Sequence, residues 1–237
     1  MSAASRRAVL LLASVALAFP LTVRADDSKT VAVTAIVEHP ALDAARDGIK
    51  DELKAEGFED GKNLVFVYES AQGNPATATQ IARKFVGDAP DVIVPISTPS
   101  AQAVVSATKD IPVVFTAVTD PVGAKLVANA EKPGGNVTGM SDLSPIGLHL
   151  DLVKEISPKA VKIGVIYNPG EANSVTLLDI LKKEAPARGM EIVEAAAPKS
   201  ADVLSAAQSL VGKVDAIYVP TDNTVVTAFE AIAKIGD

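Results

Sequence analysis

The sequence predicts an α/β protein built as two similar lobes, and three observations support that fold class. Short Val/Ile-rich strands alternate with amphipathic helices along most of the 237 residues. Apolar residues make up 48% of the chain but aromatic residues only 4%, which suits helices packed on buried parallel strands. Two stretches about 125 residues apart are alike, FVGDAPDVIVPIST and LVGKVDAIYVPTDN. The alternation predicts parallel strands joined by right-handed helical crossovers, and the repeat predicts two such units.

The first lobe is predicted to cover residues 26–140, where four strands alternate with three helices. Gly57 is expected to end the first helix, and Asn74 with Pro75 to open the second. Thr98, followed by Pro99, is predicted to cap the third helix. The predicted strands are residues 30–37, 63–70, 91–96 and 111–121, and the predicted helices are residues 40–58, 74–88 and 98–110.

A stretch rich in glycine, proline and small polar residues, EKPGGNVTGMSDLSP at 131–145, interrupts the alternation and is predicted to be a turn and linker. The second lobe is assigned to residues 141–237. It contains only three predicted strands, fewer than a parallel sheet normally has, so we expect the sequence to stop before the last strands of this lobe. The predicted strands are residues 161–169, 190–198 and 214–220, and the predicted helices are residues 146–157, 171–189, 200–213 and 223–236.

The N-terminus has the pattern of a secretory signal peptide, residues 1–25. Arg6 and Arg7 form a positive start, and residues 8–21 form an apolar run too short to span a bilayer comfortably. Cleavage is expected after Ala25. Because the chain has no cysteine, disulfides, thiolate metal sites and a lipid-modified N-terminal cysteine are excluded. These observations predict a protein of the bacterial periplasm.

The charge balance argues against a nucleic-acid partner. The chain has 22 basic and 29 acidic residues, a net charge of −7, and such an acidic surface repels phosphate backbones and anionic membranes. The low aromatic content also offers no stacking surface for bases.

Polar clusters follow the predicted strands, at the strand ends where open α/β sheets bind ligands. If the two lobes face each other, these groups converge on one cleft. The helix beginning at Thr98 offers free N–H groups to a carboxylate, and Asp222, or alternatively Asp142 or Glu38, could hold an ammonium group. A small zwitterion is therefore the predicted ligand. The candidate ligand-binding residues are Thr98, Ser100, Thr119, Ser141, Asp142, Asn168, Asn173, Asp222 and Asn223.

Simpler roles remain open for several of these residues. Thr98 and Asn223 could merely cap helices, which is worth about 1 kcal/mol each. Asp222 could be a solvated turn residue, and His39 could only form the turn before Pro40. Tyr167 could line the cleft or pack in the core.

Seven stretches together resemble one known family. They are EHPALDAARDGIKDEL, NPATATQIARKF, PISTPSAQA, FTAVTDPVGAKLV, KPGGNVTGMSD, GVIYNPGEANSV and DAIYVPTDNTVV. From about residue 31 onward the chain is similar to ABC-transporter substrate-binding proteins, in the branch associated with tryptophan and other aromatic amino acids. The resemblance implies a type I periplasmic-binding-protein fold, in which two Rossmann-like lobes close on a ligand, with further strands beyond residue 237.

The resemblance also implies a function. It predicts the solute-binding component of an ABC importer, a monomer without cofactor or metal, which delivers an amino acid to a membrane permease. The site residues that it carries over are Thr98, Ser100, Thr119, Asn168, Asp222 and Asn223. A ligand-binding sensor domain of a membrane receptor is the alternative. An enzyme is not expected, because the sequence has no cysteine nucleophile, no G-x-S-x-G elbow, no phosphate loop and no metal-spaced histidine pair.

Overall fold

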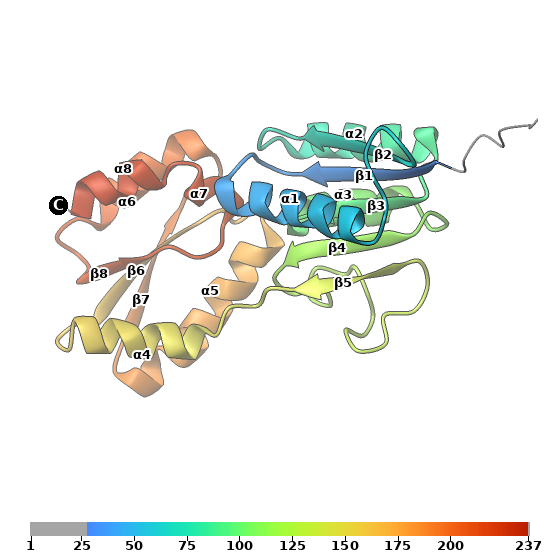
Figure 1. Cartoon of the computed structure of the whole chain (residues 1–237). Coiled ribbons are helices and arrows are strands. Elements are labelled where there is room, and N and C mark those ends of the chain that lie inside the picture. The colour runs from blue at the N-terminus through green and yellow to red at the C-terminus, as the bar shows by residue number, and fades with distance from the viewer. Residues whose placement is uncertain (1–27, 237) are drawn as a thin grey trace, which may run out of the picture.

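The computed structural model describes residues 28–236, so the signal peptide predicted for residues 1–25 lies outside the described residues. Two parallel sheets, each with its own helices, form two lobes that meet where the chain passes from β5 to α4 (Figure 1). The first sheet has the order β2-β1-β3-β4-β5 and the second has the order β7-β6-β8. Every recorded strand pair is parallel.

The first sheet is covered on both faces. Alternation along β1 sends Ala32 to one face and Val31 and Val33 to the other. Helices α2 and α3 pack on the first of these faces, and α1 packs on the second. The strands are β1 (Lys29–Ala35), β2 (Leu64–Ser70), β3 (Val92–Ile96), β4 (Val113–Val118) and β5 (Val137–Ser141). The helices are α1 (Pro40–Ala55), α2 (Pro75–Asp88) and α3 (Thr98–Ala107).

The second sheet is smaller and follows the same plan. One of its cores lies under α4 and α5, around Leu150 and Leu181, and the other lies under α6, α7 and α8, around Val203 and Val225. The strands are β6 (Lys162–Tyr167), β7 (Glu191–Ala196) and β8 (Ala216–Tyr218). The helices are α4 (Ile146–Ile156), α5 (Ala172–Glu184), α6 (Val203–Leu210), α7 (Asn223–Val226) and α8 (Phe229–Gly236), with 3-10 turns at Pro186–Arg188 and Ser200–Asp202.

The prediction that residues 131–145 form only a turn and linker is wrong, because β5 lies within them and pairs with β4. Its hydrophobic signal is weak since Val137 is its single buried residue. At Gly139 a Cβ atom would lie 2.1 Å from the Phe115 carbonyl oxygen, so only glycine fits. An edge strand that approaches its neighbour through glycine carries little of the Val/Ile pattern that identifies buried strands.

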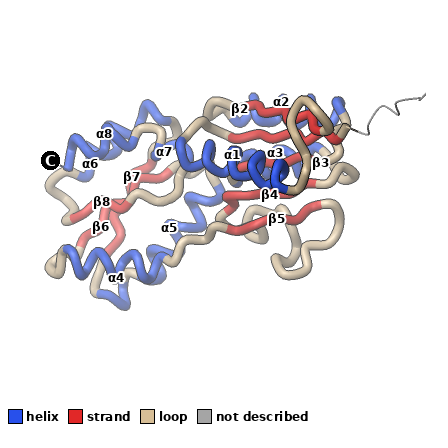
Figure 2. Tube along the Cα trace, viewed as in Figure 1, coloured by secondary structure: helices blue, strands red, loops and turns tan. Residues whose placement is uncertain are grey.

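Two helix predictions also need correction (Figure 2). The single helix predicted for residues 223–236 is split into α7 and α8. At the break the Thr227 hydroxyl donates to the Thr224 carbonyl, 2.7 Å away, a local bond that competes with helix continuation. Thr98 is not the cap of α3 but its first residue, and Ser97 occupies the cap position without a side-chain cap bond.

Candidate ligand-binding cavity between the lobes

A cavity of about 220 Å³ lies between the two lobes, at the carboxyl ends of their strands. Its size is below the roughly 300–1,000 Å³ of drug-sized ligand sites, which suits one small molecule. Six of the nine predicted site residues line it. The lining residues are His39, Ala41, Leu42, Thr98, Ala117, Thr119 and Asp142 from the first lobe and Asn173, Thr221, Asp222, Asn223 and Val226 from the second.

The first-lobe wall begins at a strained turn that leads from β3 into α3. Ser97 has φ +82° and ψ 156°, a conformation that is nearly restricted to glycine. This turn places Thr98 on the cavity and buries its side chain, and the Thr98 Oγ1 atom has no hydrogen-bond partner among the described residues. The neighbouring hydroxyls of Ser97 and Ser100 are buried and unpartnered in the same sense. The start of α3 therefore offers hydrogen-bonding capacity that the described residues leave unused.

The remaining first-lobe wall comes from the ends of β4 and β5. The pairing of these strands shifts register between Phe115 and Val118, and Ala117 within this irregularity has φ +51°. Thr119 and Asp142, which follow these two strands, both line the cavity. The Ser141 hydroxyl donates to the Thr119 carbonyl at 2.8 Å, so Ser141 supports the wall but does not line it.

Asp142 places a carboxyl on the cavity wall. Solvent reaches this residue, but partial burial of its carboxyl raises the pKa above the ordinary value. Hydrogen bonds from its own backbone N–H group and from the Thr119 side chain offset part of that effect. Neither lysine nor arginine is among the described residues that line the cavity. A cationic ligand group would supply the missing counter-charge.

The second-lobe wall is centred on Asp222, which is fully buried and is the cap of α7. Its Oδ1 atom accepts from the Thr224 and Val225 N–H groups at 2.9 and 2.8 Å. Its Oδ2 atom accepts from the Asn168 N–H group at 2.5 Å and from the Ser174 hydroxyl. Burial raises the Asp222 pKa, as does the nearby charge of Glu171. The alternative of a solvated turn residue is therefore wrong, and four internal donors occupy the carboxylate.

Asn168 and Ser100 stand apart from the cavity. Asn168 lines a second, larger hollow between the lobes, and its amide bonds to the Gly170 N–H group and the Thr224 hydroxyl. Ser100 lies on α3 but lines neither hollow. Glu38, one of the alternatives for an ammonium partner, accepts from Gln72 at 3.1 Å and lies on a separate surface pocket.

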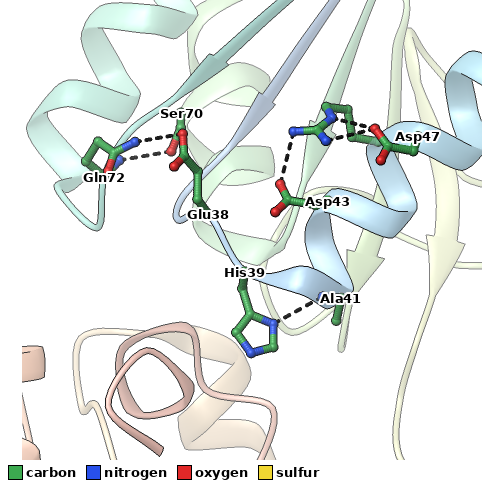
Figure 3. Close-up of polar contacts among 8 residues, drawn as sticks. Glu38, His39, Ala41, Asp43, Asp47, Ser70 and Gln72 are labelled. Carbon is green, nitrogen blue, oxygen red and sulfur yellow. Dashed lines mark hydrogen bonds and ion pairs between the residues drawn. The ribbon is translucent and has the colours of Figure 1, made fainter.

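His39 contributes both to a helix cap and to the cavity. Figure 3 shows its imidazole at the start of α1, where Nδ1 accepts from the Ala41 N–H group at 3.3 Å. His39 also lines an adjoining pocket with Val219 and Phe229 of the second lobe. The two interpretations of His39, a turn residue and a cleft residue, are thus compatible.

Glu171, which is not among the predicted site residues, is a buried carboxylate beneath the second-lobe wall. It accepts hydrogen bonds from Asn173, Asn223 and Thr224. One signal in the sequence could have revealed it: a glutamate stands where α5 begins, at the cap position. Glutamate is not a preferred capping residue, so its presence there indicates another role.

Two further properties of residues 28–236 bear on function. None of their helices is long and apolar enough to cross a membrane. They contain no group of three or more His, Cys, Asp or Glu side chains placed to hold a metal ion.

Comparison with known proteins identifies the family. The sequence profile described as "ABC transporter substrate binding protein" matches residues 30–237. The Tyrosine-binding protein of Clostridioides difficile (strain R20291) is 48% identical over 209 residues, which are 88% of this chain and 61% of that protein. The chain therefore spans less than two thirds of the length of this curated relative.

Two solved structures differ in their similarity to this one. The ABC domain in complex with L-Trp from Streptococcus pneumonia is 36% identical, with a TM-score of 0.85 over 89% of this chain and 71% of the other. A ligand-free, open substrate-binding protein from Clostridium difficile is 47% identical, yet its TM-score is 0.62 over 88% of this chain and 70% of the other. The overall arrangement is thus nearer to the L-Trp complex although the sequence is nearer to the open protein.

These findings confirm the α/β fold class, the family resemblance and the expectation that the chain is not an enzyme. The fold, the profile match across residues 30–237 and the 48% identity to a curated relative lead to one conclusion. The chain belongs to the ABC transporter substrate-binding protein family.

Proposed function

We propose that this protein is the solute-binding component of an ABC importer and holds an aromatic amino acid between two lobes, residues 26–140 and 141–237. The observation that carries the proposal is the cavity itself. Both lobes line it, and it combines a carboxyl without a basic partner, Asp142, with a buried unpartnered hydroxyl, Thr98. A ligand that satisfies both groups lies against the first lobe, and its contacts with Asn173, Asn223 and Val226 of the second lobe favour the closed arrangement.

The ammonium group of the ligand binds to Asp142 in this proposal. Of the three carboxylates considered from the sequence, Asp222 is occupied by four internal donors and Glu38 lies on another pocket. Asp142 lines the cavity and is open to solvent, so a ligand can reach it. An ammonium group there would relieve the unfavourable environment that raises the Asp142 pKa.

The carboxylate group of the ligand binds at the start of α3. Backbone N–H groups at a helix N-terminus favour negative charge, and the Thr98 hydroxyl can donate to a carboxylate oxygen. The strained Ser97 conformation supports a functional role for this turn, since such strain is retained where it positions a site.

The side chain of the ligand packs against the apolar part of the cavity, formed by Leu42, Ala117 and Val226. The names of the relatives support an aromatic amino acid, since one is called a tyrosine-binding protein and another was solved with L-Trp. The similarity to that complex supports a closed arrangement of the lobes in this structure.

The proposed location is the periplasm, after removal of residues 1–25 by cleavage behind Ala25. Substrate-binding proteins of ABC importers work outside the cytoplasm, and the signal-peptide pattern agrees with that location. A membrane permease is the proposed partner, and the protein is proposed to act as a monomer.

Isothermal titration calorimetry with L-tyrosine, L-tryptophan and L-phenylalanine tests the proposal, with L-leucine and a neutral sugar as comparison ligands. We expect at least one aromatic amino acid to bind with a dissociation constant in the micromolar range or below. Absence of heat with all three aromatic amino acids, under conditions where circular dichroism shows a folded protein, would contradict the proposed function.

A further inference from the structure

Glu171 lies beneath the second-lobe wall with only donors around its carboxylate. The Oε2 atom accepts from Asn173 Nδ2 at 3.2 Å, from Asn223 Nδ2 at 2.6 Å and from the Asn223 N–H group at 3.1 Å. The Oε1 atom accepts from the N–H group and the hydroxyl of Thr224 at 3.0 and 2.7 Å. An ionised carboxylate accepts every one of these bonds, and it shares the Thr224 N–H group with Asp222 Oδ1, 2.9 Å away.

This carboxylate determines which way the Asn173 side chain faces. The Asn173 Nδ2 group donates to Glu171 and also to the Thr221 carbonyl at 3.0 Å. A carboxylate and a carbonyl can only accept, so turning the amide round would place its oxygen against two other acceptors. The orientation of the amide is therefore fixed by its surroundings.

The fixed orientation leaves the Asn173 oxygen without a partner. Asn173 is 3% exposed and lines the cavity, and its Oδ1 atom has no hydrogen-bond partner among the described residues. A buried acceptor of this kind costs free energy unless a donor reaches it, and from the cavity that donor can be a group of the ligand or a water molecule. Together with the Asp142 carboxyl, this oxygen gives the cavity two acceptors on opposite lobes.

We propose that Glu171 is a positioning residue for ligand specificity: by holding the Asn173 amide group, it turns the amide oxygen toward the ligand and so selects a ligand with an ammonium group. The inference rests on the proposed function and adds the reason why an amino acid is preferred over the same molecule without its ammonium group. Glu171 does not contact the ligand itself in this arrangement.

The test is a ratio of two affinities measured by calorimetry. The first ligand pair is L-tyrosine and 3-(4-hydroxyphenyl)propanoate, which lacks the ammonium group, and the second pair is L-tryptophan and 3-indolepropanoate. In the wild-type protein we expect the amino acid to bind more tightly by about tenfold or more, the usual size of a hydrogen bond to a charged group. In Glu171→Gln the side chain can present an NH₂ group to Asn173, so that only the Thr221 carbonyl still holds the Asn173 amide in its orientation, and the ratio is expected to fall several-fold.

Two further variants complete the test. Asn173→Ala removes the acceptor but leaves the Asn223 and Thr224 bonds to Glu171 in place, so it should weaken binding of the amino acid and leave the deaminated analogue nearly unchanged. This variant decides the question if Glu171→Gln does not fold. Glu155→Gln, on the exposed side of α4, is the matched control and should keep the wild-type ratio.

The outcomes separate the two proposals. If both ligands of a pair lose affinity equally in Glu171→Gln and in Asn173→Ala, the role of Glu171 is purely structural and the inference is overturned while the proposed function stands. If the wild-type protein binds no amino acid, the proposed function fails and the inference fails with it.

Discussion

Thr98 and Thr34 each bury a hydroxyl group that has no hydrogen-bond partner among the described residues. Thr98 lines the cavity, whereas Thr34 lies within β1 and does not. A ligand can therefore compensate the first hydroxyl but not the second, which makes the two threonines a matched pair.

Replacing Thr98 by valine should separate stability from binding. The change removes a buried unpartnered hydroxyl at nearly constant volume, so the unliganded protein should gain about 1 kcal/mol in its free energy of unfolding. The affinity for the amino acid should fall, because valine cannot donate to the ligand carboxylate. Urea unfolding and calorimetry measure the two effects.

The control is Thr34→Val, which should give a similar gain in stability with no change in affinity. Equal effects of the two substitutions on ligand affinity would show that Thr98 has no special relation to the cavity.

The ionised Asp142 carboxylate should lower the stability of the unliganded protein while it favours binding of the amino acid. Its raised pKa means that the folded protein holds this proton more tightly than the unfolded chain does. The contribution of Asp142 to stability therefore falls as pH rises from the ordinary aspartate pKa through the raised one. Asp142→Asn should remove this pH dependence without destabilising the protein at neutral pH, and should weaken binding of the amino acid by about tenfold or more.

The measurement is urea unfolding at several pH values together with calorimetry at neutral pH. An Asp142→Asn protein that binds the amino acid like the wild type would place the ammonium group elsewhere in the cavity.

At the scale of elements, in each lobe an aspartate accepts hydrogen bonds from backbone N–H groups at the start of the first strand. Asp91, just before β3, accepts from the Thr30 N–H group at 2.8 Å, and Asp215, just before β8, accepts from the Val161 and Lys162 N–H groups at 2.8 Å each. These backbone hydrogen bonds are the main cause of the lowered pKa of both aspartates. The duplication seen in the sequence thus extends to an interaction that aligns neighbouring strands.

These two aspartates should act on stability in the opposite sense to Asp142. A lowered pKa gives stability that is present above the ordinary aspartate pKa and is lost as pH falls through the folded-state pKa. Asp91→Asn and Asp215→Asn should each reduce the loss of stability between neutral pH and about pH 3, relative to the wild type. The urea midpoint against pH measures this loss, with Asp51→Asn on the exposed face of α1 as control. If both variants lose as much stability as the wild type between neutral pH and about pH 3, the two aspartates do not have this role.

The sequence predicted those elements that have a strong periodic pattern. The strands β1, β3 and β6 and the helices α1, α2 and α5 were found because burial on both faces, or on one stripe, leaves a clear apolar repeat. The strand β5 was missed since it is an edge strand with one buried residue, and the break after α7 falls at a threonine whose hydroxyl donates to the Thr224 carbonyl. Such features depend on contacts with neighbouring strands or on local hydrogen bonds, which periodicity does not encode.

The candidate site was predictable to a similar extent and for a similar reason. Polar residues at strand ends converge in any parallel sheet, and this topology brought six of the nine candidates to the cavity. It could not distinguish Asp142, which is open to a ligand, from Asp222, whose oxygens are occupied by internal donors. Glu171 escaped notice because its importance lies in the side chains that it orients.

At the scale of the whole molecule, two separately packed lobes meet at a cavity that is lined by both. The apolar cores of the two sheets form distinct clusters, so each lobe can move as a unit without disrupting its own core. The greater similarity to the L-Trp complex than to the open relative indicates that more than one arrangement of such lobes exists in the family. A ligand shifts the balance between them only by its difference in affinity for the two.

Small-angle X-ray scattering should therefore show compaction when the ligand is added. In the proposed arrangement the ammonium group contacts Asp142 in the first lobe and the Asn173 oxygen in the second, so it makes both contacts only when the lobes are closed. The amino acid should reduce the radius of gyration, whereas the deaminated analogue, even at saturating concentration, should reduce it less. In Asp142→Asn the two ligands should produce the same, smaller change. Equal compaction of the wild-type protein by both ligands would mean that the ammonium group contributes equally to the open and closed arrangements, and the lobes would then close around the rest of the molecule.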